Sequence, residues 1–166
     1  GSNPRYSYTP AHEDAIIDWV AERNPLAAEV LRWQRAAGLR INEAVLARLD
    51  KIDFESGTIE VKGKGGRIRV VTVTDRELLD RLDRTQRFPL LHGLARNWIR
   101  TIEKLVHEAC VELNIKPLGT HAFRAGAAQH QYDTLREHGF SDREARKEVS
   151  RLLGHNRISV TNSYAP

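Results

Sequence analysis

The sequence predicts a mainly α-helical α+β domain that contains one small three-stranded antiparallel sheet. A capping residue followed by proline occurs at Thr9-Pro10 and again at Asn24-Pro25, and this pairing is typical of helix starts. Residues 53–73 instead alternate and are rich in β-branched side chains, which favours short strands. The chain has 166 residues, 40% of them hydrophobic, which is enough to bury a core.

Three helices are expected before the strands. The first two begin at Pro10 and Pro25, and glycine at position 38 ends the second because it tolerates the left-handed conformation of a helix stop. A short helix over about 41–48 follows. The apolar residues that recur at helical spacing in the first two helices are Ile16, Trp19, Val20, Leu26, Val30 and Trp33.

The strands are separated by turns expected at Glu55–Gly57 and Gly63–Gly66. Thr74 and Glu77 form a capping-box pattern, which predicts that the next helix starts at this point. A long amphipathic helix is expected over 94–113.

Two further helices are expected towards the end of the sequence. Thr120 is placed to cap a helix that starts at His121. Ser141 and Glu144 form a second capping-box pattern, and Gly154 is placed to end that last helix.

The charge balance permits a polyanionic partner such as nucleic acid. The net charge is +4 and the pI about 9.5. Residues 62–69, KGKGGRIR, carry basic side chains and no acidic one, which fits either a DNA contact or a solvated hairpin tip. Cys110 is the only cysteine, so the sequence allows no intrachain disulfide and suits a reducing cytoplasm. No apolar run approaches the ~18–20 residues of a membrane span.

Four places combine basic or titratable residues with a defined backbone position. Arg40 and Glu43 lie three residues apart after a predicted helix end. They can form a surface ion pair, or Glu43 can fix the direction in which the Arg40 side chain points. Lys64 lies between glycines in a hairpin turn, where it can bind phosphate, act as a general acid or keep the turn soluble. His121 and Arg124 share one face of a first helical turn, whose free N–H groups favour an anion.

The fourth place is the pair of His155 and Tyr164, nine residues apart. A structural histidine at a helix end and a solvated tail tyrosine are the ordinary explanations for these residues. As a set, however, the four places match phosphoryl transfer at a phosphodiester, which needs a nucleophile, donors to the phosphate oxygens and an acid for the leaving oxygen. Arginine suits the oxygens because its guanidinium is planar and always charged.

The order of these motifs resembles the catalytic domain of the tyrosine recombinase, or phage integrase, family. The motifs are G-L-R-x-x-E-A, a G-K-G hairpin, H-x-x-R, L-G-H and a tyrosine nine residues later, and the resemblance spans about residues 10–164. Phe123 and Ala125 stand where the family commonly has Leu and His. The resemblance implies a tyrosine-recombinase catalytic-domain-like fold.

The resemblance also implies a role for each matching residue. Tyr164 attacks the scissile phosphate and forms a 3′-phosphotyrosyl link. Arg40 and Arg124 bind the non-bridging oxygens, and His155 adds a hydrogen bond there. Lys64 protonates the leaving 5′ oxygen.

The remaining site residues have supporting roles. The resemblance implies that His121 assists proton transfer and that Glu43 supports the site. Lys62, Arg67 and Arg69 are expected to contact DNA because they make up the rest of the basic cluster. The family's chemistry needs no metal or other cofactor.

The resemblance sets expectations for the domain and its partners. We expect residues 1–3 to be an expression-tag remnant and leader, residues 4–166 to be a single catalytic domain, and the N-terminal core-binding domain of the family to be absent. The expected partners are double-stranded DNA and, in the full-length protein, further copies of the chain in a tetramer on DNA, with no membrane. The expected location is the cytoplasm of a bacterium, associated with the nucleoid, the protein being encoded by the bacterium or a phage.

Three other interpretations remain open at this point. One is a type IB topoisomerase-like enzyme, which uses the same chemistry to relax DNA. Another is a DNA-binding module whose site is catalytically inactive. The third is a metal enzyme, because His107 and Cys110 lie three apart on a predicted helix.

Overall fold

The computed structural model describes residues 6–86 and 94–154, except for the side chain of Lys64. The chain forms two compact units. One consists of Gly1–Leu46 with Pro89–Gln129, and the other of Ala47–Phe88 with His130–Pro166. Among the described residues, no helix has both the length and the apolar character needed to cross a membrane.

The first unit is helical. It contains α1 (Pro10–Arg23), α2 (Pro25–Ala37), α3 (Ile41–Val45), α5 (Ala95–Glu112) and the first part of α6 (His121–Glu137). The predicted starts of α1 and α2 are confirmed, since Thr9 and Asn24 each accept a main-chain N–H from the first helical turn. α3 is shorter than the predicted helix over 41–48, because the chain is extended at Arg48 and then forms the 3₁₀ turn η1 (Leu49–Lys51).

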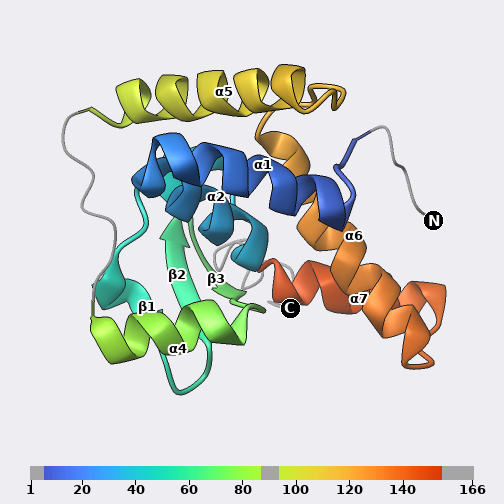
Figure 1. Cartoon of the computed structure of the whole chain (residues 1–166). Coiled ribbons are helices and arrows are strands. Elements are labelled where there is room, and N and C mark those ends of the chain that lie inside the picture. The colour runs from blue at the N-terminus through green and yellow to red at the C-terminus, as the bar shows by residue number, and fades with distance from the viewer. Residues whose placement is uncertain (1–5, 87–93, 155–166) are drawn as a thin grey trace. The chain divides into compact units, whose positions relative to one another are not determined.

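The core of the first unit lies where α1, α2 and α5 pack against one another, and α5 runs alongside α1 (Figure 1). Each helix turns one apolar stripe inward, as the helical spacing predicts. The largest completely enclosed side chain of this core is Trp33 of α2. Other buried members are Ile16, Val20, Leu31, Ile102, Val106 and Phe123.

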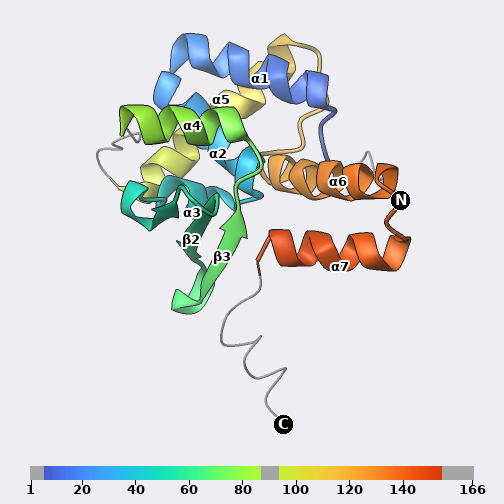
Figure 2. The same ribbon diagram turned by 90° about the horizontal axis from the view of Figure 1, so that it is seen from below.

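The second unit contains the three predicted strands, in the order β1-β2-β3 and all antiparallel. They are β1 (Ile52–Asp53), β2 (Thr58–Lys62) and β3 (Ile68–Thr72), and the turn between the last two is η2 (Lys64–Gly66). The unit also contains α4 (Arg76–Thr85), the second part of α6 and α7 (Asp142–Leu152). The end of α7 lies beside β3 (Figure 2).

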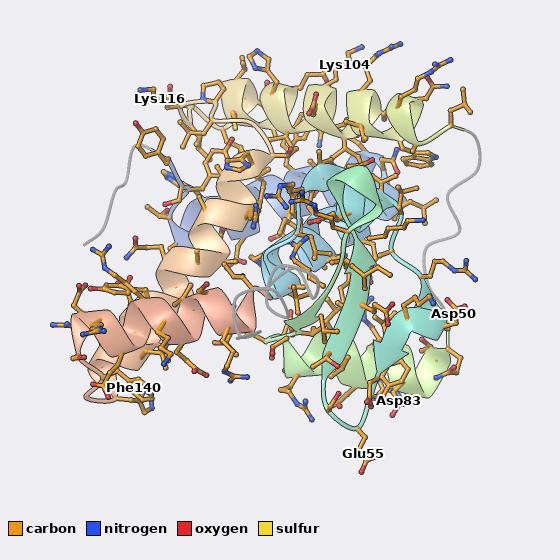
Figure 3. The ribbon with its side chains drawn as sticks, turned by 180° about the vertical axis from the view of Figure 1, so that it is seen from behind. Asp50, Glu55, Asp83, Lys104, Lys116 and Phe140 are labelled. Carbon is orange, nitrogen blue, oxygen red and sulfur yellow. The ribbon has the colours of Figure 1, made fainter. Side chains whose placement is uncertain are left out.

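The turns of the sheet lie where the sequence predicts them. Glu55 lies at the tip of the turn between β1 and β2 and points into solvent (Figure 3). Gly57 completes this turn with φ +71°, a conformation that favours glycine. A Cβ on Gly57 would lie 3.5 Å from Leu79 Cδ2, so α4 packs closely over the turn.

The two predicted capping boxes have different outcomes. The box at Ser141 and Glu144 is confirmed, because each side chain accepts the other's main-chain N–H, at 3.1 and 3.0 Å. The box at Thr74 is wrong by one residue. Asp75 is the N-cap of α4 and its carboxylate accepts the N–H of Leu78 at 3.0 Å. Like threonine, aspartate can accept an N–H of the first turn, but its negative charge also favours the positive end of the helix dipole, which a neutral threonine cannot do.

A carboxyl group is buried in the first unit. Glu13 of α1 is only 6% exposed, and a Cβ on Gly126 of α6 would lie 2.6 Å from its Oε2. Burial raises the pKa of Glu13 from an ordinary value of 4.5 to about 7, although the charge of Arg35 opposes this shift. Because the folded state then binds a proton more tightly than the unfolded state, this group makes stability fall as pH rises from about 4.5 through about 7.

We therefore expect Glu13→Gln to stabilise the protein at pH 8 but not at pH 4. A gain of about 1 kcal/mol at pH 8 corresponds to a rise of ~2–4 °C in melting temperature for a domain of this size. Thermal unfolding followed by circular dichroism at both pH values measures the difference. Glu22→Gln, on the exposed side of the same helix, is the control and should change neither. An equal effect of Glu13→Gln at both pH values would contradict the prediction.

Candidate active site

Arg40 and Glu43 are joined by a hydrogen bond and an ion pair at the start of α3. Glu43 Oε1 accepts the main-chain N–H of Arg40 at 2.9 Å, and Glu43 Oε2 lies 3.5 Å from Arg40 Nη1. The Glu43 side chain is 1% exposed, whereas the Arg40 side chain is 55% exposed. The buried carboxylate therefore holds both the backbone and the guanidinium of Arg40 while that guanidinium still reaches solvent.

Arg124 reaches the turn that precedes this pair. Its Nε donates to the carbonyl oxygen of Gly38 at 3.0 Å. Gly38 follows α2 in the left-handed conformation, with φ 63°, so the chain turns here and places Arg40 two residues further on. The H-x-x-R and G-L-R-x-x-E-A motifs, far apart in the sequence, are thus joined by a direct hydrogen bond within the first unit.

His121 and Arg124 lie on the first turn of α6, as predicted. His121 is the first residue of the helix and is exposed. Their i,i+3 spacing places both on one face of α6.

A tyrosine that the motif analysis did not single out holds the segment before α6. Tyr8 Oη accepts the N–H of Leu118 at 3.0 Å and donates to the carbonyl oxygen of Gly119 at 3.2 Å. The thiol of Cys110 donates to Tyr8 Oη at 3.5 Å. The ring also packs against Phe123, with centroids 5.4 Å apart. Burial raises the pKa of the Tyr8 hydroxyl well above its ordinary value, so the hydroxyl stays protonated and able to donate.

The basic cluster of the second unit contains residues of two kinds. Lys62 and Arg67 are exposed; Lys62 is the last residue of β2, and Arg67 lies between η2 and β3. Arg69 is only 8% exposed, and its Nε donates to the carbonyl oxygen of Leu153 at 3.1 Å. Lys64 begins η2, so its backbone lies in the predicted hairpin turn.

The last two predicted site residues, His155 and Tyr164, lie outside the described residues. The residue before them, Gly154, is described and has φ +83° just after the end of α7. Gly154 therefore ends α7 as the sequence predicts.

The metal interpretation has little support in the described part of the chain. His107 is exposed and Cys110 is completely buried, and burial raises the pKa of the Cys110 thiol. A buried thiol is a poor metal ligand because binding requires the thiolate. Among residues 6–86 and 94–154 no group of three or more His, Cys, Asp or Glu side chains could hold a metal ion.

A comparison with protein families shows to which family the chain belongs. The model of the phage integrase family matches residues 10–166, which include every predicted site residue. The chain belongs to the phage integrase family.

Curated members of this family are similar over most of the chain. Tyrosine recombinase XerD of Pseudomonas putida (strain KT2440) is 30% identical over 159 residues, which cover 87% of this chain and 50% of that protein. Tyrosine recombinase XerC of Bifidobacterium longum (strain DJO10A) is 29% identical over 182 residues, which cover 95% of this chain and 48% of that protein. The chain thus spans about half the length of the curated relatives that it matches.

Solved structures of integrases confirm the predicted fold. Lambda integrase bound to DNA has a TM-score of 0.64 at 17% identity, over 93% of this chain and 58% of that one. The Tn1549 transposon integrase in complex with transposon right end DNA also has a TM-score of 0.64, at 18% identity, over 99% of this chain and 63% of that one. This family member therefore has the integrase fold as well as the family's sequence pattern.

The contacts of Tyr8 lead to a prediction about stability. Tyr8→Phe keeps the ring against Phe123 but removes the hydrogen bond to the partly buried N–H of Leu118, and one such hydrogen bond contributes about 0.5–1.5 kcal/mol. Urea denaturation measures this loss. The control is Tyr6→Phe, because Tyr6 is 63% exposed and its change should cost almost nothing. Equal stability of the two variants would contradict the role of the Tyr8 hydroxyl.

Proposed function

We propose that this chain is the catalytic domain of a tyrosine-type site-specific recombinase, a DNA strand transferase that cleaves and rejoins DNA through a 3′-phosphotyrosyl intermediate. The observation that carries the proposal is the hydrogen bond from Arg124 to Gly38, next to the Arg40–Glu43 pair. Two arginines of separate motifs are thereby held at one turn, and paired guanidinium groups suit the oxygens of a phosphodiester.

The proposed reaction conserves the energy of the phosphodiester bond. The phenolic oxygen of Tyr164 gives up its proton, a transfer that His121 assists, and forms a bond to phosphorus. The bond from phosphorus to the 5′ oxygen breaks at the same time, and Lys64 supplies the proton that the leaving oxygen needs. Arg40 and Arg124 stabilise the charge on the non-bridging oxygens in the transition state, and His155 donates a further hydrogen bond. The reverse attack by a 5′ hydroxyl rejoins the strand.

Two residues assist this chemistry indirectly. His121, which lies on the exposed first turn of α6, assists proton transfer. Glu43 holds Arg40 in place through the two contacts described above. The reaction uses no metal or other cofactor, since the tyrosyl link stores the bond energy.

The proposed substrate is double-stranded DNA, which exposed cations of the hairpin contact through its phosphates. Lys62 and Arg67 have the exposure that such contacts require. Lambda integrase has been solved both bound to DNA and as a dimer on a core site. We extend that behaviour to this protein, with a tetramer of the full-length protein on DNA in the cytoplasm, associated with the nucleoid, of a bacterium that carries its own or a phage's gene.

The first experiment looks for the covalent intermediate. Supercoiled plasmid is incubated with the protein in EDTA, quenched with detergent and analysed for protein joined to a DNA 3′ end. We expect an adduct with the wild type and none with Tyr164→Phe. An adduct that persists in Tyr164→Phe would overturn the assignment of the nucleophile.

Further measurements on the same two proteins separate the other interpretations. Duplex binding that depends on salt, equal in both proteins and without any adduct on the protein's own site, would favour the inactive DNA-binding module. Relaxation of plasmid without strand exchange between two defined sites would favour the topoisomerase-like enzyme. An adduct that forms without EDTA but not in its presence would favour a metal enzyme.

Arg124→Ala tests the transition-state role of the arginine pair. We expect single-turnover cleavage to fall by about 10²–10³-fold, the usual cost of removing one donor to a developing oxyanion, while duplex affinity changes much less. Filter binding and cleavage of a nicked substrate measure the two quantities. Arg100→Ala, at an exposed position of α5, is the matched control. Equal losses of affinity and rate in Arg124→Ala would make Arg124 a simple binding residue.

A further inference from the structure

Arg69 occupies a position on β3 that faces inward. Buried and less buried residues alternate along the strand, and Arg69 is in phase with Val71 and Val73. Its register partner on β2 is Val61, which is also buried. A guanidinium on this face is costly to bury unless its N–H groups are satisfied, so Arg69 needs hydrogen-bond acceptors nearby.

The end of α7 supplies such an acceptor. Arg69 Nε donates to the carbonyl oxygen of Leu153, the C-cap residue of α7. The last carbonyls of a helix have no partner within the helix and carry the negative end of its dipole. A cation that binds one of them therefore both satisfies the group and holds the helix end against the strand.

Gly154 allows the end of α7 to lie close to β3. An added Cβ would lie 2.5 Å from the carbonyl oxygen of Val70 and 2.9 Å from Val71 Cγ1, so the glycine lies directly on the β3 backbone. Its φ of +83° also disfavours any other residue. The Arg69 side chain and the lack of a side chain at Gly154 thus both hold the end of α7 on β3.

We infer that Arg69 is a positioning residue for the catalytic histidine rather than a DNA contact. The chain leaves α7 at Leu153 and Gly154, and His155 is the next residue. Docking of these two residues on β3 sets where the segment that carries His155 and Tyr164 begins. The inference rests on the proposed function, in which both of those residues act on the phosphate.

Arg69→Lys tests the inference, because lysine keeps the charge but has no Nε–H in the geometry of the guanidinium. We expect single-turnover cleavage of a nicked substrate to fall by about 10–100-fold, the usual cost of losing an outer-shell partner, with duplex affinity within about twofold of the wild type. Arg84→Lys, on an exposed position of α4 in the same unit, is the matched control and should change neither quantity.

A second variant approaches the contact from the glycine. Gly154→Ala should give the same separation of rate from affinity, because its methyl group would displace the end of α7 from Val70. Since both changes disturb one docking contact, the double variant should lose less than the product of the two single losses. Multiplicative losses would show that Arg69 and Gly154 act separately, which would overturn the shared docking role.

Hydrogen exchange tests the contact without any reaction. The amides of Leu153 and Gly154 close the last turn of α7 on Val149 and Arg151, and they should exchange faster in Arg69→Lys than in Arg84→Lys. If the wild type forms no tyrosyl adduct, the proposed function fails but this comparison still decides the contact. Equal exchange, or equal losses of affinity and cleavage in Arg69→Lys, would overturn the positioning role.

Discussion

The hydrogen bond from Arg124 Nε to the Gly38 carbonyl oxygen is the contact on which the first unit's site depends. It requires that α2 stop at a left-handed glycine, since only then does that carbonyl leave the helical ladder. It also requires a fixed start for α6, which Tyr8 supplies through Leu118 and Gly119. The site is thus a consequence of how two helices end and begin, more than of any one side chain.

The second unit uses the same device. There Arg69 Nε binds the carbonyl oxygen of Leu153 at the end of α7, and a left-handed glycine, Gly154, follows. In both units the carbonyl at a helix end receives a guanidinium, and a motif residue comes one or two positions after the glycine. The negative end of a helix dipole favours a cation at this place, so each contact satisfies a carbonyl and fixes the exit of the chain.

The local signals predicted the fold well, and the contacts between distant segments less so. Proline after a capping residue and alternation in strands depend on neighbours in sequence, so the starts of α1 and α2 and the three strands follow from them. The start of α4 was missed because Thr74 and Asp75 are both good caps, and only the backbone shows which one is used. Pairs such as Tyr8 with Leu118 are separated by 110 residues, and no local pattern predicts them.

Arg69 shows what the pattern of charge alone leaves out. Clustering places it with Lys62 and Arg67, yet the strand alternation in the same residues puts it in phase with Val71 and Val73. The two signals conflict, and the alternation is the stronger because a change of face would expose the strand's apolar side chains. Exposed cations contribute to DNA binding through counterion release and are screened by salt, whereas a buried guanidinium is screened much less. Burial therefore separates Arg69, which binds the protein's own backbone, from Lys62 and Arg67, whose exposure fits the proposed DNA contacts.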